Sequence, residues 1–324
     1  MQTQALSGCV ISLDPLVIMA ARNDTEHLGL ATLHPEWFEG RPSLHFIKPT
    51  HSMMGRVESL PPLLEQMATR LPQAKFVIMA NEELELVELQ SHGVTSFVAN
   101  NFLLIDENTF VPDPGAQRRN DAIYNAMFRA LKNHQLCARI PSLALIYYPL
   151  EGYSEAGYER DVRQLLKHAD VLNEPVGGPY RYMGADEVVA AINASHVGLC
   201  LSEKEGAMRA CCEFLLCGIP VVTVPALGGR MRYLTLGNSR VVEPDAVAVA
   251  EAVAGLKSLD LDPYEIREDF LSIIEFERRN FLAYINACIE KQFGVTNCVR
   301  SFAGFRGASN YTPIWKWKQW LGAA

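Results

Sequence analysis

The chain has 324 residues, with 29 Lys or Arg against 37 Asp or Glu residues, which gives a formal net charge of −8 at pH 7. Hydrophobic residues make up 49% and charged residues 20%, which is the balance of a folded globular protein and excludes a disordered one. The negative charge and the lack of a basic stripe argue against a nucleic-acid surface. No apolar run approaches the roughly 20 residues that a membrane span needs, and the length suffices for two domains.

The N-terminus, MQTQALSGCVISLD, lacks the basic flank and apolar core of a signal peptide. Eight cysteines lie mostly in apolar periodic segments: Cys200, Cys211, Cys212, Cys217 and Cys288. We therefore expect buried, reduced thiols and a cytoplasmic protein. Adjacent cysteines on a helix point about 100° apart, and no CxxC spacing accompanies the group at 211–217, so we expect no metal site.

The first hundred residues alternate short apolar runs with helical patterns. Strands are expected over 43–49, 75–80 and 95–105, and helices over 59–71 and 82–93. This βαβαβ order predicts a parallel sheet with helices on both faces.

A second α/β segment follows a polar stretch. Residues 106–119, DENTFVPDPGAQRR, have two prolines, one glycine and no apolar periodicity, so they are predicted to be a linker. Strands are expected over 121–126, 142–150, 170–175, 196–202 and 219–224, helices over 131–140, 154–169, 185–195, 207–217 and 263–293, and a strand then a helix over 239–259. The expected fold class is α/β, with two Rossmann-like doubly wound domains, 1–105 and 120–295, that face a cleft.

The most informative stretch is SEKEGAMRACCEFLLCGIPVVTVPALGG, from Ser202 to Gly229. It follows a buried strand, so it lies where doubly wound folds bind ligands. The start of the helix, with Gly206 beside it, is suited to an anion. Glu213 follows Glu205 by eight positions, which is roughly 12 Å along a helix. A nucleotide-diphosphate sugar has hydroxyls at both ends and a diphosphate between them.

A structural alternative stands beside this interpretation. Ser202 and Glu205 have the spacing of a capping box, in which each side chain satisfies a backbone N–H at a helix start. Glu213 is harder to explain in that way, because a carboxylate on an apolar helix face is costly without a partner.

The pattern S-x-x-E-G-x-x-x-x-x-x-E-x-L-x-C-G-x-P-V-V, followed by Gly228 and Gly229, resembles the donor site of retaining glycosyltransferases. The likeness is to family 4 of the GT-B fold (glycosyl transferases group 1), and it covers roughly residues 95–255. The segments 100–112, 121–136 and 185–206 are similar to the family more weakly. The first hundred residues resemble it only in their βαβ rhythm.

The resemblance implies roles for individual residues. Glu205 would contact the hydroxyls of the donor sugar, and Glu213 those of the ribose. Lys132 would neutralise the departing diphosphate. The backbone N–H groups that meet the diphosphate would be those of Gly206, Ala207 and Met208. The family places an arginine five residues before the lysine, where this chain has Met127, and Arg129 is the nearby substitute.

Three further residues are candidates on weaker grounds. His51 follows a strand of the first domain, and family members often use a histidine of that domain near the sugar; an ordinary loop histidine is the alternative. Tyr182 and Met183 match the loop near the nucleobase by position, and simple packing explains them equally well.

The last residues, YTPIWKWKQWLGAA, hold three tryptophans and two lysines. We expect the tail, 300–324, to pack back on the first domain, with a peripheral position on the inner face of a membrane as the alternative. The expected activity is transfer of a sugar from a nucleotide diphosphate to a hydroxyl of a glycan, polysaccharide or glycolipid, with retention and with no metal or other cofactor. The competing interpretation is a catalytically degenerate relative that binds a nucleotide sugar or a partner without turnover.

Overall fold

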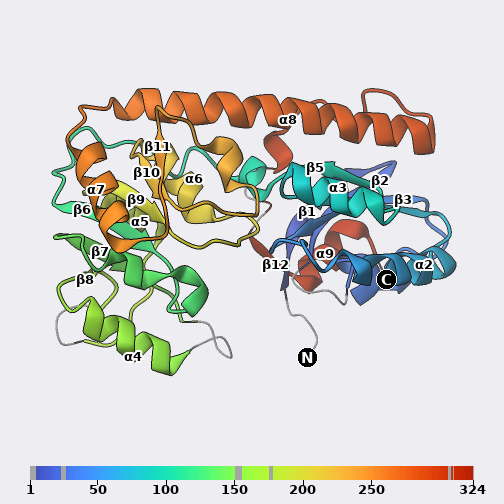
Figure 1. The fold of residues 1–324 in the computed structure, drawn as a ribbon. Helices are drawn as coiled ribbons and strands as arrows, with labels where there is room; N and C mark the ends of the chain where they lie inside the picture. Colours follow the sequence, from blue (N-terminus) through green and yellow to red (C-terminus); the bar gives the residue numbers. More distant parts are fainter. Residues whose placement is uncertain are drawn as a thin grey trace. The chain divides into compact units, whose positions relative to one another are not determined.

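The computed structural model describes residues 5–22, 27–149, 155–174, 178–305, 308 and 310–323. The chain forms two compact units (Figure 1). Unit 1 combines Met1–Asp106 with Ile274–Ala324, and unit 2 is the continuous segment Glu107–Ile273. Each unit is an α/β structure with a six-stranded sheet, which confirms the predicted fold class.

The sheet of unit 1 has the strand order β12-β1-β2-β3-β4-β5. Its strands are β1 Ala5–Leu13, β2 Leu16–Arg22, β3 Ser43–Pro49, β4 Ala74–Ala80, β5 Ser96–Val98 and β12 Tyr311–Pro313. The strands from β2 to β5 are parallel, whereas β1 runs antiparallel to both of its neighbours. The sequence analysis proposed no element before residue 43, although an Asp-Pro pair separates two apolar runs there, which is a turn signal.

Helices and 3-10 turns accompany these strands in unit 1. They are α1 Leu30–Leu33, α2 Leu60–Arg70, α3 Glu83–Ser91, η1 Pro35–Trp37, η2 Val57–Ser59, η3 Asn101–Leu104, η7 Ala303–Phe305 and α9 Ile314–Leu321. The expected strand over 95–105 is shorter than predicted. It ends at Val98, because the Asn100 side chain accepts a hydrogen bond from the Phe102 backbone N–H at 2.9 Å and begins a 3-10 turn.

The C-terminal segment lies on unit 1. β12 pairs with Ala5–Ser7 of β1, and α9 follows it directly. Trp317 is fully buried among the core residues of this unit, and its Nε1 donates to the Leu6 carbonyl at 3.1 Å.

The sheet of unit 2 is entirely parallel, with the order β11-β10-β9-β6-β7-β8. Its strands are β6 Asn120–Asn125, β7 Leu143–Ile146, β8 Asp170–Val171, β9 Ser195–Cys200, β10 Val221–Thr223 and β11 Ser239–Val241. The chain builds outward from β6 to β8, then returns to the other side of β6 with β9. This reversal creates a topological switch point between β6 and β9, where doubly wound folds bind ligands.

The helices of unit 2 are α4 Ala156–Leu165, α5 Ala185–Asn193, α6 Arg209–Leu216 and α7 Ala246–Lys257, with 3-10 turns η4 Ala130–Lys132, η5 His134–Cys137 and η6 Arg230–Tyr233. The prediction of one helix over 131–140 was wrong. Asn133 has a left-handed backbone (φ 52°), so the segment is two short 3-10 turns on either side of it.

The long helix α8, Pro263–Phe293, begins in unit 2 and ends in unit 1. Its bounds match the helix predicted over 263–293. Unit 2 therefore ends at Ile273, whereas the sequence analysis placed the end of the second domain at 295. Phe281, Ile285 and Ile289 are fully buried, and the Phe281 ring lies 5.6 Å from the Phe46 ring of unit 1. Among the described residues, the structure has no helix that is both long and apolar enough to cross a membrane.

Candidate functional site

Lys132 and Glu205 meet at the switch point of unit 2. Lys132 comes from the segment that follows β6, and Glu205 from the segment that follows β9. The Lys132 Nζ donates a hydrogen bond to Glu205 Oε1. Their side chains are only 11% and 14% exposed, so the ion pair is largely removed from water.

The backbone around Lys132 is held by neighbouring side chains. Tyr124, on β6, donates its hydroxyl to the Lys132 carbonyl, and burial raises the pKa of Tyr124 well above its usual range, so it remains a neutral donor. Asn133 Nδ2 donates to the Leu201 carbonyl at 3.1 Å. The segments after β6 and β9 are thus linked one residue from the lysine.

The capping-box interpretation of Ser202 and Glu205 was wrong. α6 begins at Arg209, and its N-cap is Met208, with no side-chain cap. Ser202 Oγ instead donates to Glu205 Oε1 at 2.7 Å. The carboxylate therefore accepts from Ser202 and Lys132 and is directed toward the switch point. The predicted helix start at 207 was two residues early, and the rise of a helix does not apply between Glu205 and Met208.

Gly228 brings a second loop close to Glu205. A Cβ at position 228 would lie 1.3 Å from the Glu205 carbonyl oxygen, and its φ of +113° also excludes ordinary side chains. Hydrogen bonds between the two loops run from Leu227 N–H to the Glu203 carbonyl at 2.9 Å and from Glu205 N–H to the Leu227 carbonyl at 3.0 Å. The glycine at 228 therefore allows the two loops to pair.

Arg230 lies beneath these loops and is 1% exposed. Its guanidinium donates to the carbonyls of Cys200 (3.1 Å), Ser202 and Val224 (3.3 Å), and its Nε donates to Thr223 Oγ1 at 3.0 Å. Among the described residues, no carboxylate forms a salt bridge with it. Arg230 therefore joins the ends of β9 and β10 and adds a buried positive charge beside the site. The sequence analysis did not identify this residue.

Glu213 is buried on α6, where its Oε1 accepts from Arg209 Nε at 3.0 Å. Burial raises the pKa of Glu213, and Arg209 opposes that shift. Arg209, four residues earlier, is the partner that the apolar helix face was expected to require; the i,i+4 spacing is the sequence signal that identifies it.

The structure describes the surroundings of the other residues predicted for donor binding. Gly206 and Met208 are buried, and Ala207 is half-buried, in the segment that leads into α6. Arg129, the proposed substitute for the missing arginine at Met127, has its Nε 3.6 Å from Glu155 Oε1. Tyr182 is 78% exposed and Met183 is half-buried, both just before α5.

His51 lies in unit 1, two residues after β3, and is exposed. Its Nδ1 is 3.0 Å from Thr50 Oγ1, and its carbonyl accepts from Asn81 Nδ2 at 3.5 Å. His51 thus lies at the carboxyl ends of the parallel strands of its own unit, which is where such sheets bind ligands.

Among the residues that the structure describes, no group of three or more His, Cys, Asp or Glu side chains is arranged to hold a metal. The cysteines are free thiols. Cys200, Cys211, Cys212 and Cys217 are buried and Cys288 is half-buried, and burial raises the pKa of Cys217 to about 12. The Cys217 thiol is therefore protonated at neutral pH.

No protein-family model matches the sequence, and no curated protein matches it. Solved structures share the fold. HepE of Anabaena, in complex with UDP, has a TM-score of 0.56 at 17% identity, over 76% of this chain and 72% of that chain. An α,α-trehalose-phosphate synthase (UDP-forming) from Burkholderia vietnamiensis has 0.52 at 13% identity, over 79% and 71%. Sucrose-phosphate synthase from Thermosynechococcus elongatus has 0.51 at 16% identity, over 78% and 68%. In its two Rossmann-like units, the chain thus has the fold of the GT-B glycosyltransferases.

Proposed function

We propose that this protein is a retaining glycosyltransferase of family 4 type. It moves a sugar from a nucleotide diphosphate to a hydroxyl of a glycan, polysaccharide or glycolipid in the cytoplasm, without a metal. The observation that carries the proposal is the contact between Lys132 and Glu205 at the switch point of unit 2. These are the two residues to which the family resemblance assigns the diphosphate and the donor sugar.

The ion pair is suited to an exchange of partners on donor binding. A diphosphate brings more negative charge than one carboxylate, so it would take over the Lys132 ammonium. Glu205 would then be free to accept hydrogen bonds from the hydroxyls of the sugar. Ser202 would keep the carboxylate in place during the exchange, since it donates to Glu205 independently of Lys132.

Catalysis in this scheme is electrostatic. The bond between the anomeric carbon and the diphosphate oxygen breaks, and the negative charge on the departing diphosphate grows. Lys132 and the backbone N–H groups of Gly206, Ala207 and Met208 would stabilise that charge. The acceptor hydroxyl passes its proton to the departing diphosphate oxygen as its own oxygen bonds to the anomeric carbon. His51 is our candidate to contact the reacting sugar. Glu213 would hold the ribose, and Tyr182 and Met183 would lie beside the base.

The solved relatives support the donor class. HepE was crystallised with UDP, and the trehalose-phosphate synthase is described as UDP-forming. Retention and metal independence rest on the family resemblance of residues 202–229.

A second candidate function follows from one departure in the sequence. Met127 stands where the family has an arginine, and Arg129 lies beside Glu155. A chain that lacks one of two cations at the diphosphate would be a nucleotide-sugar-binding or partner-binding protein with no turnover.

Product analysis separates the two candidates. The protein would be incubated with UDP-, GDP- and ADP-sugars, with and without glycan acceptors, and in the presence of EDTA. Transfer or slow hydrolysis, with an unchanged anomeric configuration by NMR, is expected for the enzyme. Binding can be detected by unfolding, because a ligand at 100 times its Kd adds about 2.7 kcal/mol to the free energy of unfolding. A donor that binds in this way, with no product formed from any donor, would establish the second candidate.

A further inference from the structure

The C-terminal segment of the chain differs in charge from the rest. From Lys291 to Ala324 there are five Lys or Arg residues and no Asp or Glu, although the whole chain has 29 and 37. Three of the four tryptophans also lie in this segment. The C-terminal segment is basic and rich in tryptophan, whereas the whole chain carries a net negative charge. This contrast indicates a partner that has a negatively charged surface and an apolar interior.

The helix α9 divides these residues between two faces. Trp317 and Leu321 are buried in unit 1. Trp315 is 67% exposed and Trp320 36% exposed, and Lys316, Lys318 and Gln319 are exposed as well. At about 100° per residue, these exposed residues, Lys318 at one edge and Trp320 at the other, span an outward arc of about 200°. The Lys316 Nζ lies 5.3 Å from the centre of the Trp320 ring. The outward face of α9 is therefore a Trp–Lys surface.

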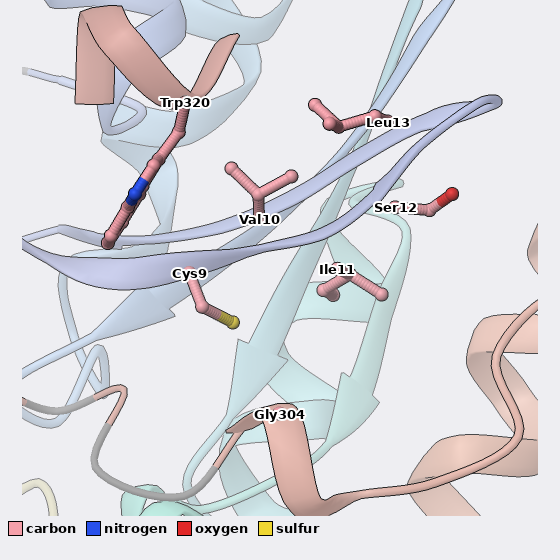
Figure 2. Close-up of a pocket in the computed structure, with 7 residues that line it drawn as sticks. All are labelled: Cys9, Val10, Ile11, Ser12, Leu13, Gly304 and Trp320. Atoms are coloured by element: carbon pink, nitrogen blue, oxygen red, sulfur yellow. The ribbon is translucent and has the colours of Figure 1, made fainter. Parts of the chain in front are cut away.

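This surface continues onto the hairpin of β1 and β2. Trp320, Gly304 and residues 9–13 of β1 line a hollow of about 480 Å³. Val10 and Leu13 lie on the side of β1 that Trp320 approaches, while Cys9 and Ile11 point the other way, toward Gly304 (Figure 2). Leu13, at the tip of the hairpin, is 58% exposed. Apolar side chains thus extend from the helix to the hairpin.

We propose that this α9 surface, formed by Trp315, Lys316, Lys318, Trp320 and Leu13, docks on an anionic lipid bilayer. Tryptophan side chains favour the boundary between headgroups and acyl chains, where the ring is apolar and the indole N–H stays hydrated. The lysines contact anionic headgroups, each worth about 1 kcal/mol near such a surface, which is about fivefold in affinity. Leu13 and the hollow beside Trp320 meet the same lipid layer. The proposal is independent of the glycosyl-transfer activity, because it uses no residue of the site in unit 2.

Vesicle sedimentation of the full chain tests the lysines. The protein is expected to sediment with vesicles of equal parts phosphatidylcholine and phosphatidylglycerol, and much less with phosphatidylcholine alone. Replacing Lys316 and Lys318 by Gln should weaken that binding about 30-fold. The matched control is Lys75→Gln with Lys167→Gln, two exposed lysines in other parts of the chain. This control has the same net charge and is expected to bind like wild type.

A second pair of variants tests the aromatic contribution. Trp315→Ser should lower binding to the mixed vesicles and reduce the quenching of tryptophan fluorescence by brominated acyl chains. Phe276→Ser, which removes a ring that is 57% exposed on α8, should change neither. Both substitutions are on the surface, so thermal unfolding should remain close to wild type.

Three results would overturn the proposal. The first is no sedimentation with the anionic vesicles. The second is an equal loss of binding in the two lysine pairs, since that would reflect net charge alone. The third is self-association by light scattering that Trp315→Ser abolishes, with no vesicle binding, since the surface would then join two copies of the chain. Donor turnover, measured without lipid, reports separately on the proposed enzymatic function.

Discussion

The two carboxylates of the candidate site have different partners, so their replacement should have different effects. Glu205 contacts Lys132 and Ser202, whereas Glu213 contacts Arg209. Glu205→Gln should leave the affinity for a nucleoside diphosphate equal or tighter, because Lys132 is released, while sugar transfer falls steeply. Glu213→Gln should weaken the diphosphate by roughly 1–3 kcal/mol through loss of charged hydrogen bonds to the ribose.

Calorimetric titration with the nucleoside diphosphate and initial-rate assays would measure both effects. Arg209→Gln is the matched control for Glu213, because it breaks the ion pair and keeps the carboxylate. Arg209 is 56% exposed, so the pair itself should contribute little. If Arg209→Gln and Glu213→Gln lost diphosphate affinity equally, Glu213 would serve only in the ion pair within α6. If Glu205→Gln turned over the donor at the wild-type rate, Glu205 would not belong to the site.

Arg230 provides a test of how the two loops are held. Arg230→Lys keeps the positive charge but cannot reach the carbonyls of Cys200, Ser202 and Val224 together with Thr223 Oγ1. Buried carbonyls left without a donor should lower the free energy of unfolding by roughly 3 kcal/mol, measured by urea denaturation. Arg160→Lys, at a side chain that is 77% exposed, should have no measurable effect. A stable Arg230→Lys variant with normal turnover would contradict this assignment.

Glu85 of unit 1 should make stability depend on pH. It is fully buried, and burial raises its pKa from the usual 4.5 to about 7, although Asn81 Nδ2 donates to both carboxylate oxygens at 3.2 Å. The unfolded chain loses this proton near pH 4.5 and the folded chain near pH 7. The free energy of unfolding should therefore fall between these values, by roughly 3 kcal/mol, and stay level above them.

Glu85→Gln should remove this decline, so the variant is more stable than wild type at pH 8 and similar at pH 4.5. Urea denaturation at a series of pH values would measure it. Glu65→Gln, at an exposed position of α2, is the control and should retain the decline. An unchanged pH profile in Glu85→Gln would assign the decline to other groups.

The sequence analysis assigned Lys132 and Glu205 to the donor through the family resemblance, and the structure brings these two side chains into contact. Arg230 and Ser202 act through carbonyl and carboxylate groups of other segments, and no local pattern encodes such contacts. Arg209 could have been found from its i,i+4 spacing to Glu213.

At the scale of elements, prediction succeeded where hydrophobic periodicity was long. α8 and β3 have the predicted bounds, and the helix within 154–169 is present as α4. It failed where one backbone conformation decides the outcome. The left-handed Asn133 divides the expected helix over 131–140, and the Asn100 cap ends the strand before 105. Both asparagines are residues that readily compete with regular structure.

The tail helix α9 should contribute to stability through one tryptophan and not the others. Trp317 is fully buried and donates to the Leu6 carbonyl, whereas Trp315 is 67% exposed. Trp317→Ala should lower the free energy of unfolding by about 3–5 kcal/mol, and Trp315→Ala should change it by less than about 0.5 kcal/mol. Thermal or urea unfolding of the full chain measures both. Equal effects of the two substitutions would show that α9 does not pack as described.

At the scale of the whole molecule, the sequence indicated two α/β units but not how the chain is divided between them. α8 is continuous in the sequence, and its apolar pattern has no break at Ile273, so the predicted second domain, 120–295, included its second half. Residues 274–293 belong with unit 1, because Arg278 donates to the Leu103 and Ile105 carbonyls and Phe281 packs near Phe46. Unit 1 therefore consists of two separate segments, and unit 2 of a single one.

This division predicts which piece of the chain folds alone. A fragment of residues 107–273 keeps the contacts of Arg267 with the Glu107 and Phe110 carbonyls and of Asn193 with Val111 and Asp113. It also keeps the whole sheet of unit 2 and the Lys132–Glu205 pair. We expect a monomer that unfolds in one cooperative transition and binds a nucleoside diphosphate.

A fragment of residues 120–295 should behave differently for two separable reasons. It lacks the partners of Arg267 and Asn193 that lie before residue 120, and it exposes Phe281, Ile285 and Ile289, which are fully buried in the intact chain. The intermediate fragment 107–293 keeps the first set of contacts and exposes the same apolar residues. Light scattering and urea denaturation should show that 107–293 folds but self-associates, and that 120–295 is both less stable and aggregated. If 120–295 were monomeric and as stable as 107–273, the second half of α8 would belong to unit 2, and the division of the chain at Ile273 would be wrong.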